Sequence, residues 1–311
     1  MGFRSNTDRL ILVDIETTYG EAATMTAADA VLAMNASIQT LAESAQRQLD
    51  KNYMGGDPFV LVGKRVELAF EISLIGHATP GTAAPCGKVL RLCGFAETLE
   101  PSDSATYTHV LNNASAESAT IDFFWAGIKF RLTGARGSLD IDYGVKGFAK
   151  GMVRAIGLLT IPADGEAPSG VSWSAFQTPP AIEESTWTVM AGAYSPHATQ
   201  FRVTDNAELP LIETSESRQV VWVNRKPAGE LTCVKNDALA TWNPWAIANA
   251  HTIVTLTSVV TGGAGKSTSV AVRAQLSMPE PTEVDGVAAY KIPFTMIPTA
   301  AGNDGLVIVF N

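Results

Sequence analysis

IDFFWAGIKFRLTGARGSLDIDYGVKGFAKGMVRAIGLLTIP, residues 121–162, contains three strand-like segments joined by turns that carry glycine. A second block with the same layout returns near the C-terminus as TIVTLTSVV (252–260), STSVAVRAQL (267–276) and VAAYKIPFTMIP (287–298). Both blocks end in Ile-Pro. A flat unit of this kind buries its faces against a neighbour of the same kind. The sequence therefore predicts an internal duplication.

Alternation predicts which face of each strand is buried. Leu139, Ile141 and Tyr143 alternate with Asp140 and Asp142, which is the period-two pattern of a half-buried strand. Upstream, the same rule assigns one apolar face to Val66, Leu68, Phe70, Ile72 and Leu74. In 149–161 the apolar side carries glycine and alanine, which predicts that another element approaches closely there.

The composition excludes several classes of protein. Of the 311 residues, 46% are hydrophobic and 17% are charged, so the chain can fill real cores. A net charge of −9 gives no general basic surface for gripping nucleic acid. Three cysteines without paired spacing predict buried thiols, not disulfides or a zinc site. We expect no signal peptide and no membrane span, because no apolar segment is long enough.

Pro, Gly and Ser clusters divide the chain into an N-terminal arm (1–56), a first domain (57–166), a linker (167–184) and a second domain (185–311). The expected fold class is α+β and mainly β, with two tandem β-sandwich or barrel domains. Each domain carries one flanking helix, predicted at Gly87–Leu99 and at Asn243–Ala250. The pattern of residues 22–50 is compatible with both a helix and an extended segment.

No motif for catalysis stands out. TGGAGKST (261–268), which contains Gly262, Gly263, Gly265 and Lys266, lacks the first glycine of a P-loop, and the segment after it alternates like a strand. We interpret it as a glycine-rich hairpin turn. The four histidines lack metal-ligand spacing. We expect no enzyme activity, no cofactor and no metal.

The N-terminal residues carry a resemblance to a family. Glu16–Gly20 reads E-x-x-Y-G, and Ala28–Val31 completes an A-x-D-A-V segment that begins at Ala27; together they resemble the start of tail tube proteins of long non-contractile-tailed bacteriophages. The resemblance covers about a tenth of the chain. The expected N-terminal arm docks on another subunit, and its candidate contact residues are Glu16, Tyr19, Gly20, Val31 and Ile38.

This resemblance implies a non-enzymatic virion protein of the tail, assembled in the host cytoplasm. It implies stacked rings, trimeric when the domain is doubled, around a lumen through which DNA passes without specific binding. It also implies tape-measure, tail terminator and distal tail proteins as partners. Asp140 and Asp142 are the candidate lumen-facing residues, because carboxylates repel phosphates. Lys150 and Arg154 fit this wall only if they face away or pair with acids.

Two other functions stay open. One is a β-sandwich binding module, such as a virion decoration or an adhesin-like protein. The other is an enzyme that binds a nucleotide at 261–268. For the tube subunit, we expect deletion of residues 1–56 to stop stacking and to leave the subunit folded.

Overall fold

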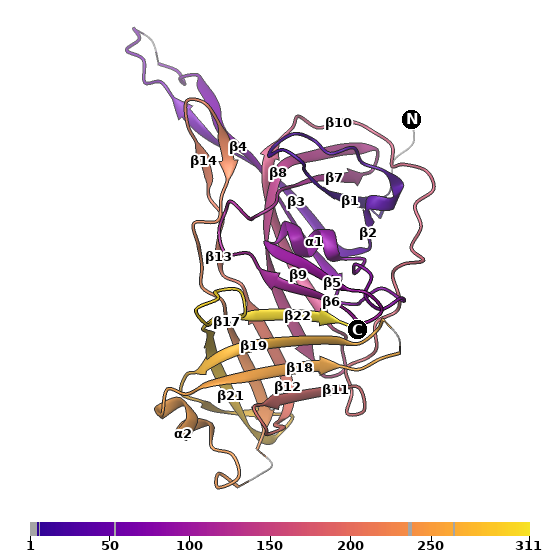
Figure 1. The fold of residues 1–311 in the computed structure, drawn as a ribbon. Helices are drawn as coiled ribbons and strands as arrows, with labels where there is room; N and C mark the ends of the chain where they lie inside the picture. The colour runs from indigo at the N-terminus through magenta and orange to yellow at the C-terminus, as the bar shows by residue number, and fades with distance from the viewer. Residues whose placement is uncertain (1–4, 6, 53, 236–237, 264) are drawn as a thin grey trace.

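The computed structural model describes the following residues (Figure 1): 5, 7–52, 54–235, 238–263 and 265–311. Strands hold 52% of the residues and helices 5%. This confirms the α+β, mainly-β class. Residues 7–164 are termed the first half and residues 187–311 the second half.

One antiparallel sheet, termed the large sheet, runs through both halves. From edge to edge its eight strands are β3 (Ala33–Gln46), β4 (Phe59–Ser73), β9 (Lys150–Leu159), β8 (Ile128–Gly144), β12 (His197–Thr204), β17 (Ala228–Val234), β21 (Val287–Met296) and β20 (Glu280–Val284). The halves meet where β8 pairs with β12, with Ile141 opposite Val203 and Tyr143 opposite Phe201. The sheet is therefore continuous across the boundary between the halves.

Further strands cover one face of the large sheet. In the first half they are β2 (Ala30–Val31), β1 (Arg9–Ile15), β7 (Ala119–Trp125), the start of β8, and β10 (Ala163–Asp164). In the second half they are β11 (Trp187–Ala191), β18 (Ile253–Val260), β19 (Thr268–Leu276) and β22 (Leu306–Phe310). β22 also pairs with β6 (Ser104–His109), which pairs with β5 (Phe95–Glu100). The last strand of the chain thus joins the two halves a second time (Figure 1).

The predicted apolar faces form a single core. Val66, Leu68, Leu139 and Ile141 are fully buried and belong to one cluster that extends through both halves. The small residues on β9 are needed for close packing: a Cβ added at Gly151 would lie 2.7 Å from Cδ1 of Leu139. The expected close approach on this face is therefore confirmed.

The N-terminal residues differ from the expected arm. β1 pairs with β7 along its whole length, and the side chains of Ile11 and Val13 are buried in the core. Residues 33–46, inside the stretch that left helix and strand open, form β3 at the edge of the large sheet. Only the outer end of the β3–β4 hairpin projects from the body (Figure 1). Most of 9–46 is thus part of the first half, because its apolar residues complete that core.

The two helices lie near the predicted positions. The predicted helix over Gly87–Leu99 is too long: α1 spans Gly87–Leu92, Gly94 adopts φ +77°, and β5 begins at Phe95. A left-handed glycine ends a helix, and the residues after it find a strand partner in β6. α2 (Pro244–Asn249) confirms its predicted start, since Oδ1 of Asn243 accepts a hydrogen bond from the backbone N–H of Ala246 (3.0 Å).

The order of strand pairing is the same in the two halves. In the first half β1 pairs with β7 and β7 pairs with β8; in the second half β11 pairs with β18 and β18 pairs with β19 in the same way. The end of β8 then pairs with β9, as β20 pairs with β21. Leu68 lies opposite Ala155 as Leu231 lies opposite Ile292. This register matches Ala155 to Ile292. Alignment on the two Ile-Pro ends gives a register that differs by one residue, because it matches the buried Ala155 to Lys291 on the opposite face of β21.

Candidate assembly interface

The face of the large sheet turned away from the core is polar and charged in both halves. Strand register places its side chains in rows, and oppositely charged neighbours pair across the strands. The ion pairs are Arg154–Glu67 (3.1 Å), Lys150–Glu71 (3.6 Å), Arg202–Asp142 (3.2 Å) and Lys291–Glu230 (2.8 Å). Exposed pairs of this kind add little stability. Their effect is to leave a surface whose positive charges are matched by carboxylates.

Asp140 and Asp142, the candidate lumen residues, both lie on this polar face. Asp142 also accepts a hydrogen bond from Nε2 of Gln200 (3.1 Å). Asp140 is half-buried and accepts one from the backbone N–H of Asp205 (3.1 Å). Burial raises the pKa of Asp140, while that hydrogen bond and Arg202 oppose the rise. Since Lys150 pairs with an acid, the face alternates in charge and is not purely acidic.

The large sheet ends in two open edges. Within the described residues, β3 pairs with β4 alone and β20 pairs with β21 alone. An edge strand presents backbone N–H and C=O groups that can pair with another chain. The molecule therefore carries one such edge in each half, at opposite ends of the same sheet.

Glu16 organises the E-x-x-Y-G segment inside the first half. Its carboxylate accepts hydrogen bonds from the backbone N–H groups of Gly20 and Gly134 (both 2.8 Å) and from the hydroxyls of Ser118 (2.6 Å) and Thr120 (2.9 Å). The ring of Tyr19 covers Gly134, where an added Cβ would lie 2.7 Å from it. These residues, expected as subunit contacts, hold their own chain together.

The other two candidate contact residues are also internal. Val31 is buried in the core, and Ile38 lies opposite Leu68 in the β3–β4 ladder and packs on the core. All five candidates thus make contacts within their own chain, and Tyr19 also accepts a hydrogen bond from Val220 of the second half. Contacts between these residues and another subunit stay a prediction.

We expect Glu16→Ala to lower the free energy of unfolding by about 3–5 kcal/mol, because buried donors lose a charged acceptor. Urea denaturation followed by circular dichroism measures the change. Glu21→Ala is the matched control, since Glu21 is exposed and close by. Equal unfolding midpoints for the two variants would contradict this role for Glu16.

A long insertion between β12 and β17, residues 205–227, lies across the first half and is termed the strap. It contains β13 (Ala207–Glu208), β14 (Leu211–Glu213), β15 (Arg218–Val220) and β16 (Asn224–Arg225). The backbone N–H of Val220 donates to the hydroxyl of Tyr19 (2.7 Å), and its carbonyl accepts from Arg136 (2.9 Å). The guanidinium of Arg136 lies over the rings of both Tyr19 (5.2 Å) and Trp222 (5.0 Å). Stacked rings and cations therefore hold the strap in place.

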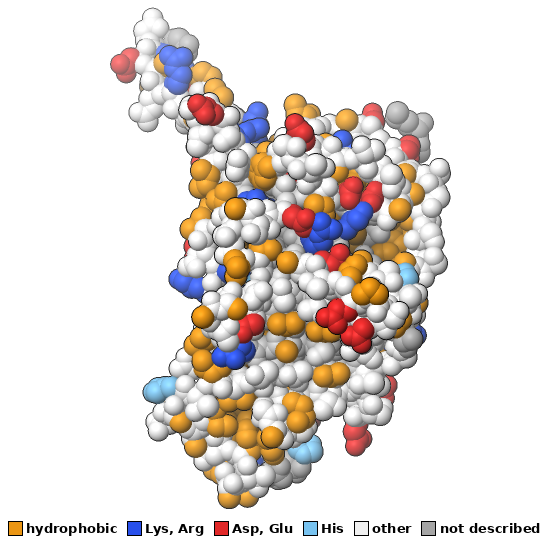
Figure 2. Space-filling model, viewed as in Figure 1, with side chains coloured by type: hydrophobic (Ala, Val, Ile, Leu, Met, Phe, Trp, Pro, Cys, Tyr) orange, Lys and Arg blue, Asp and Glu red, His pale blue; other side chains and the backbone are white. Residues whose placement is uncertain are grey.

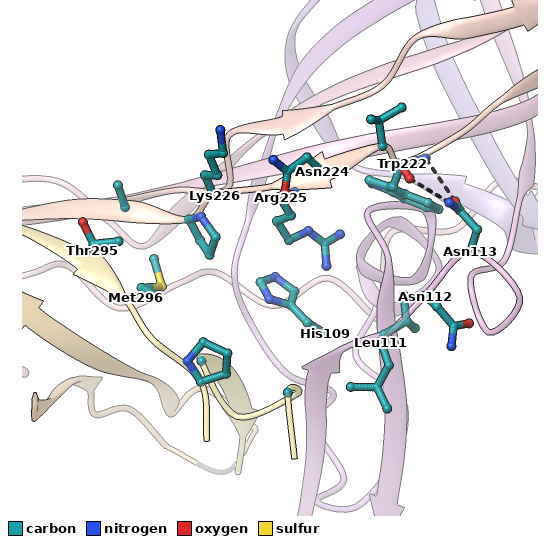
Figure 3. Close-up of a pocket in the computed structure, with 17 residues that line it drawn as sticks. His109, Leu111, Asn112, Asn113, Trp222, Asn224, Arg225, Lys226, Thr295 and Met296 are labelled. Atoms are coloured by element: carbon teal, nitrogen blue, oxygen red, sulfur yellow. Dashed lines mark hydrogen bonds between the residues drawn. The ribbon is translucent and has the colours of Figure 1, made fainter. Parts of the chain in front are cut away.

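A cavity of about 870 Å³ opens beside the strap, and Figure 3 shows His109 and Arg225 next to each other in it. Nε of Arg225 lies 2.9 Å from Oδ1 of the fully buried Asp205. Burial raises the pKa of Asp205 to about 6 against the opposing effect of Arg225. Burial and the nearby Arg225 together hold the pKa of His109 well below its usual value. The ion pair lies within the strap, and Arg225 also ties the strap to the first half by donating a hydrogen bond to the carbonyl of Cys93 (3.1 Å).

The β3–β4 hairpin has a free outer end, residues 42–64, termed the free hairpin. β3 and β4 remain paired there, from Glu43–Val62 to Gln46–Phe59. Large apolar side chains are exposed along it: Phe59, Val60, Leu61, Val62 and Met54. Figure 2 shows hydrophobic side chains along this projection. These side chains lie on both sides of the hairpin, because successive strand residues face opposite ways.

The glycine-rich segment is a turn between β18 and β19, as interpreted. Val260 pairs with Thr268, and the backbone N–H of Lys266 donates to the carbonyl of Gly263 (2.8 Å). Gly265 adopts φ +72° against the backbone of His77, where a Cβ would clash at 2.0 Å from the carbonyl oxygen. Together with Gly262, these glycines serve the turn and its packing. Strand β19 follows, so there is no helix N-terminus to hold a phosphate.

The cysteines are buried free thiols, as predicted. Across the described part of the chain, no group of three or more His, Cys, Asp or Glu side chains could hold a metal ion. No helix in that part is long and apolar enough to cross a membrane.

No family model matches the chain, and no curated protein matches it. The arrangement of sheet, edges and insertions is therefore the basis for assigning a function.

Proposed function

We propose that the protein is a structural subunit that assembles into rings, which stack into the tail tube of a long non-contractile-tailed bacteriophage. The observation that carries the proposal is the large sheet, which is continuous through the chain and open at both edges. Joining β20 of one copy to β3 of the next continues the same sheet. Such head-to-tail contacts make a closed ring when the rotation closes.

The matching order of pairing supports the idea that the halves are repeats. The internal junction between β8 and β12 then serves as a template for the contact between copies, since β8 corresponds to β20 and β12 to β3. Three copies would place six equivalent halves around one axis. The large sheets would close into a barrel, which removes every open edge.

The polar face supports a lumen for DNA. Its Lys and Arg side chains are paired with carboxylates such as Glu67 and Glu71, so few positive charges are free to hold phosphates. Affinity for DNA depends on the neutralisation of phosphates by free cations. A wall with matched charges, on a chain of net charge −9, lets DNA slide. Tape-measure, terminator and distal tail proteins are the partners that the proposal implies.

The internal junction predicts the register between copies. Asp140 lies opposite Thr204, and the corresponding residues are Thr282 on β20 and Leu41 on β3. Leu41→Cys combined with Thr282→Cys should therefore give disulfide-linked trimers, because directly opposite residues have Cα atoms about 4.5–5.5 Å apart. Non-reducing gel electrophoresis of concentrated protein measures this.

The matched control combines Thr40→Cys with Thr282→Cys, because adjacent residues on a strand face opposite ways. The natural thiols interfere little, since burial raises the pKa of Cys86 and of Cys233 to about 12. Trimers from the first pair alone support the proposal. A protein that stays monomeric, with no crosslink from either pair, would contradict it and favour a β-sandwich binding module.

A further inference from the structure

The two halves carry equally long insertions at corresponding places. Ile38 lies opposite Leu68 in the first half, and Phe201 lies opposite Leu231 in the second. When these two pairs are superposed, residues 42–64 correspond to residues 205–227. The free hairpin therefore corresponds to the strap. The strap lies on the first half of its own chain, whereas the free hairpin projects beyond the body (Figure 1).

Trp222 is one of the residues through which the strap packs on the first half, together with Val220 and Arg225. It lies against Gly94, the left-handed residue after α1, where an added Cβ would be 3.0 Å from the indole. Its ring also faces the guanidinium of Arg136 (5.0 Å), and Asn113 donates to its carbonyl (2.7 Å). In the free hairpin the residue that corresponds to Trp222 is Phe59, which is 60% exposed.

The second half has an unfilled site at the position that corresponds to the contact made by Trp222. His251 follows α2 with φ +53°, as Gly94 follows α1 with φ +77°. Met278 lies between β19 and β20, at the position that Arg136 holds within β8, and is 56% exposed. His251 and Met278 line a cavity of about 350 Å³, together with Leu276 and Thr295.

We infer that the free hairpin of one copy lies across the second half of the neighbouring copy in the ring, with Phe59 in the cavity beside His251 and Met278. The inference rests on the proposed function, because β3 and β20 must meet before the hairpin can reach. The aromatic ring takes the place of Trp222, and the thioether of Met278 takes the place of the guanidinium of Arg136. Contacts between sulfur and aromatic rings are favourable, so the thioether of Met278 can pack on the ring of Phe59 as the guanidinium of Arg136 packs on Trp222.

A second copy is the occupant that the geometry favours. The free hairpin and α2 lie at opposite ends of the molecule (Figure 1), so Phe59 cannot fill the cavity of its own chain. Both the hairpin and the cavity rim expose apolar side chains, and both lie next to the open edges. The strap already shows how such an insertion packs on a half of this kind.

Phe59→Cys combined with Met278→Cys tests the inference, because a disulfide between them must join two copies. The control pair is Val60→Cys with Met278→Cys, since Val60 points to the other side of the strand. We expect crosslinking at least about tenfold faster for the first pair, given the narrow geometry of a disulfide.

The Leu41–Thr282 pair, run in parallel, separates the two proposals. Crosslinks at both Leu41–Thr282 and Phe59–Met278 support the hairpin site. A crosslink at Leu41–Thr282 with equal, slow rates for Phe59 and Val60 would overturn the hairpin site and leave the ring intact. Failure of every pair would overturn the ring and, with it, the inference.

Discussion

We expect that a chain lacking residues 1–56 does not fold, whereas the sequence alone predicts a folded subunit that fails to stack. The deletion removes β1, β2 and β3, and with them the buried side chains of Ile11, Val13 and Val31. Each such side chain contributes about 1.5–3 kcal/mol by burial, and a whole domain is stable by only about 5–15 kcal/mol. The carboxylate of Glu16 and its four hydrogen bonds are lost as well.

Circular dichroism and urea denaturation of the truncated chain give the measurement. A chain that begins at Thr7 is the control, because it keeps β1 and the whole Glu16 network. We expect a cooperative transition for the control and none for the chain that begins at Asp57. A folded truncated chain would contradict this prediction, because it would show that the N-terminal strands are not needed for folding, as expected of an arm.

Shortening the free hairpin should have the opposite effect. Replacing residues 44–61 with Asn-Gly joins Glu43 to Val62, which are already paired, through a two-residue turn that suits a hairpin. The removed side chains are exposed, so the urea midpoint should stay unchanged. Assembly should need about 100-fold more protein, because buried aromatic and apolar anchors dominate an interface.

The strap supplies the matched control for this variant. Replacing residues 207–225 with a short turn removes Trp222 and Arg225, which contact the first half within the same chain. That variant should lose stability, since Arg136 and Asp205 lose their partners. If shortening the free hairpin destabilised the monomer as much, or left assembly unchanged, the division between an internal strap and a hairpin for a second copy would be wrong.

Sequence reasoning predicted the parts of the fold that depend on alternation. Leu139, Ile141 and Tyr143 are buried as expected, and Asp140 and Asp142 share the other face, because a strand has only two faces to offer. The N-cap of α2 at Asn243 is also determined by neighbouring residues, because its side chain bonds to the backbone of Ala246. In these cases a few neighbouring residues determine the structure.

Contacts between distant segments could not be predicted in the same way. The helix expected to reach Leu99 ends early because β5 pairs with β6, a preference that the helical spacing of Ala96 and Leu99 does not reveal. Glu16 and Gly134 meet only in the folded chain, and so do Tyr19 and Val220. The positions of the strap, of the buried Asp205 and of the open edges likewise follow from topology.

Electron microscopy of the purified protein across a concentration series, with class averages down the particle axis, tests the central claim most directly. The account predicts hollow rings or tubes whose averages have three-fold symmetry and six lobes. Compact monomers at every concentration, or closed particles without a central channel, would contradict a ring built by joining the edges of the large sheet.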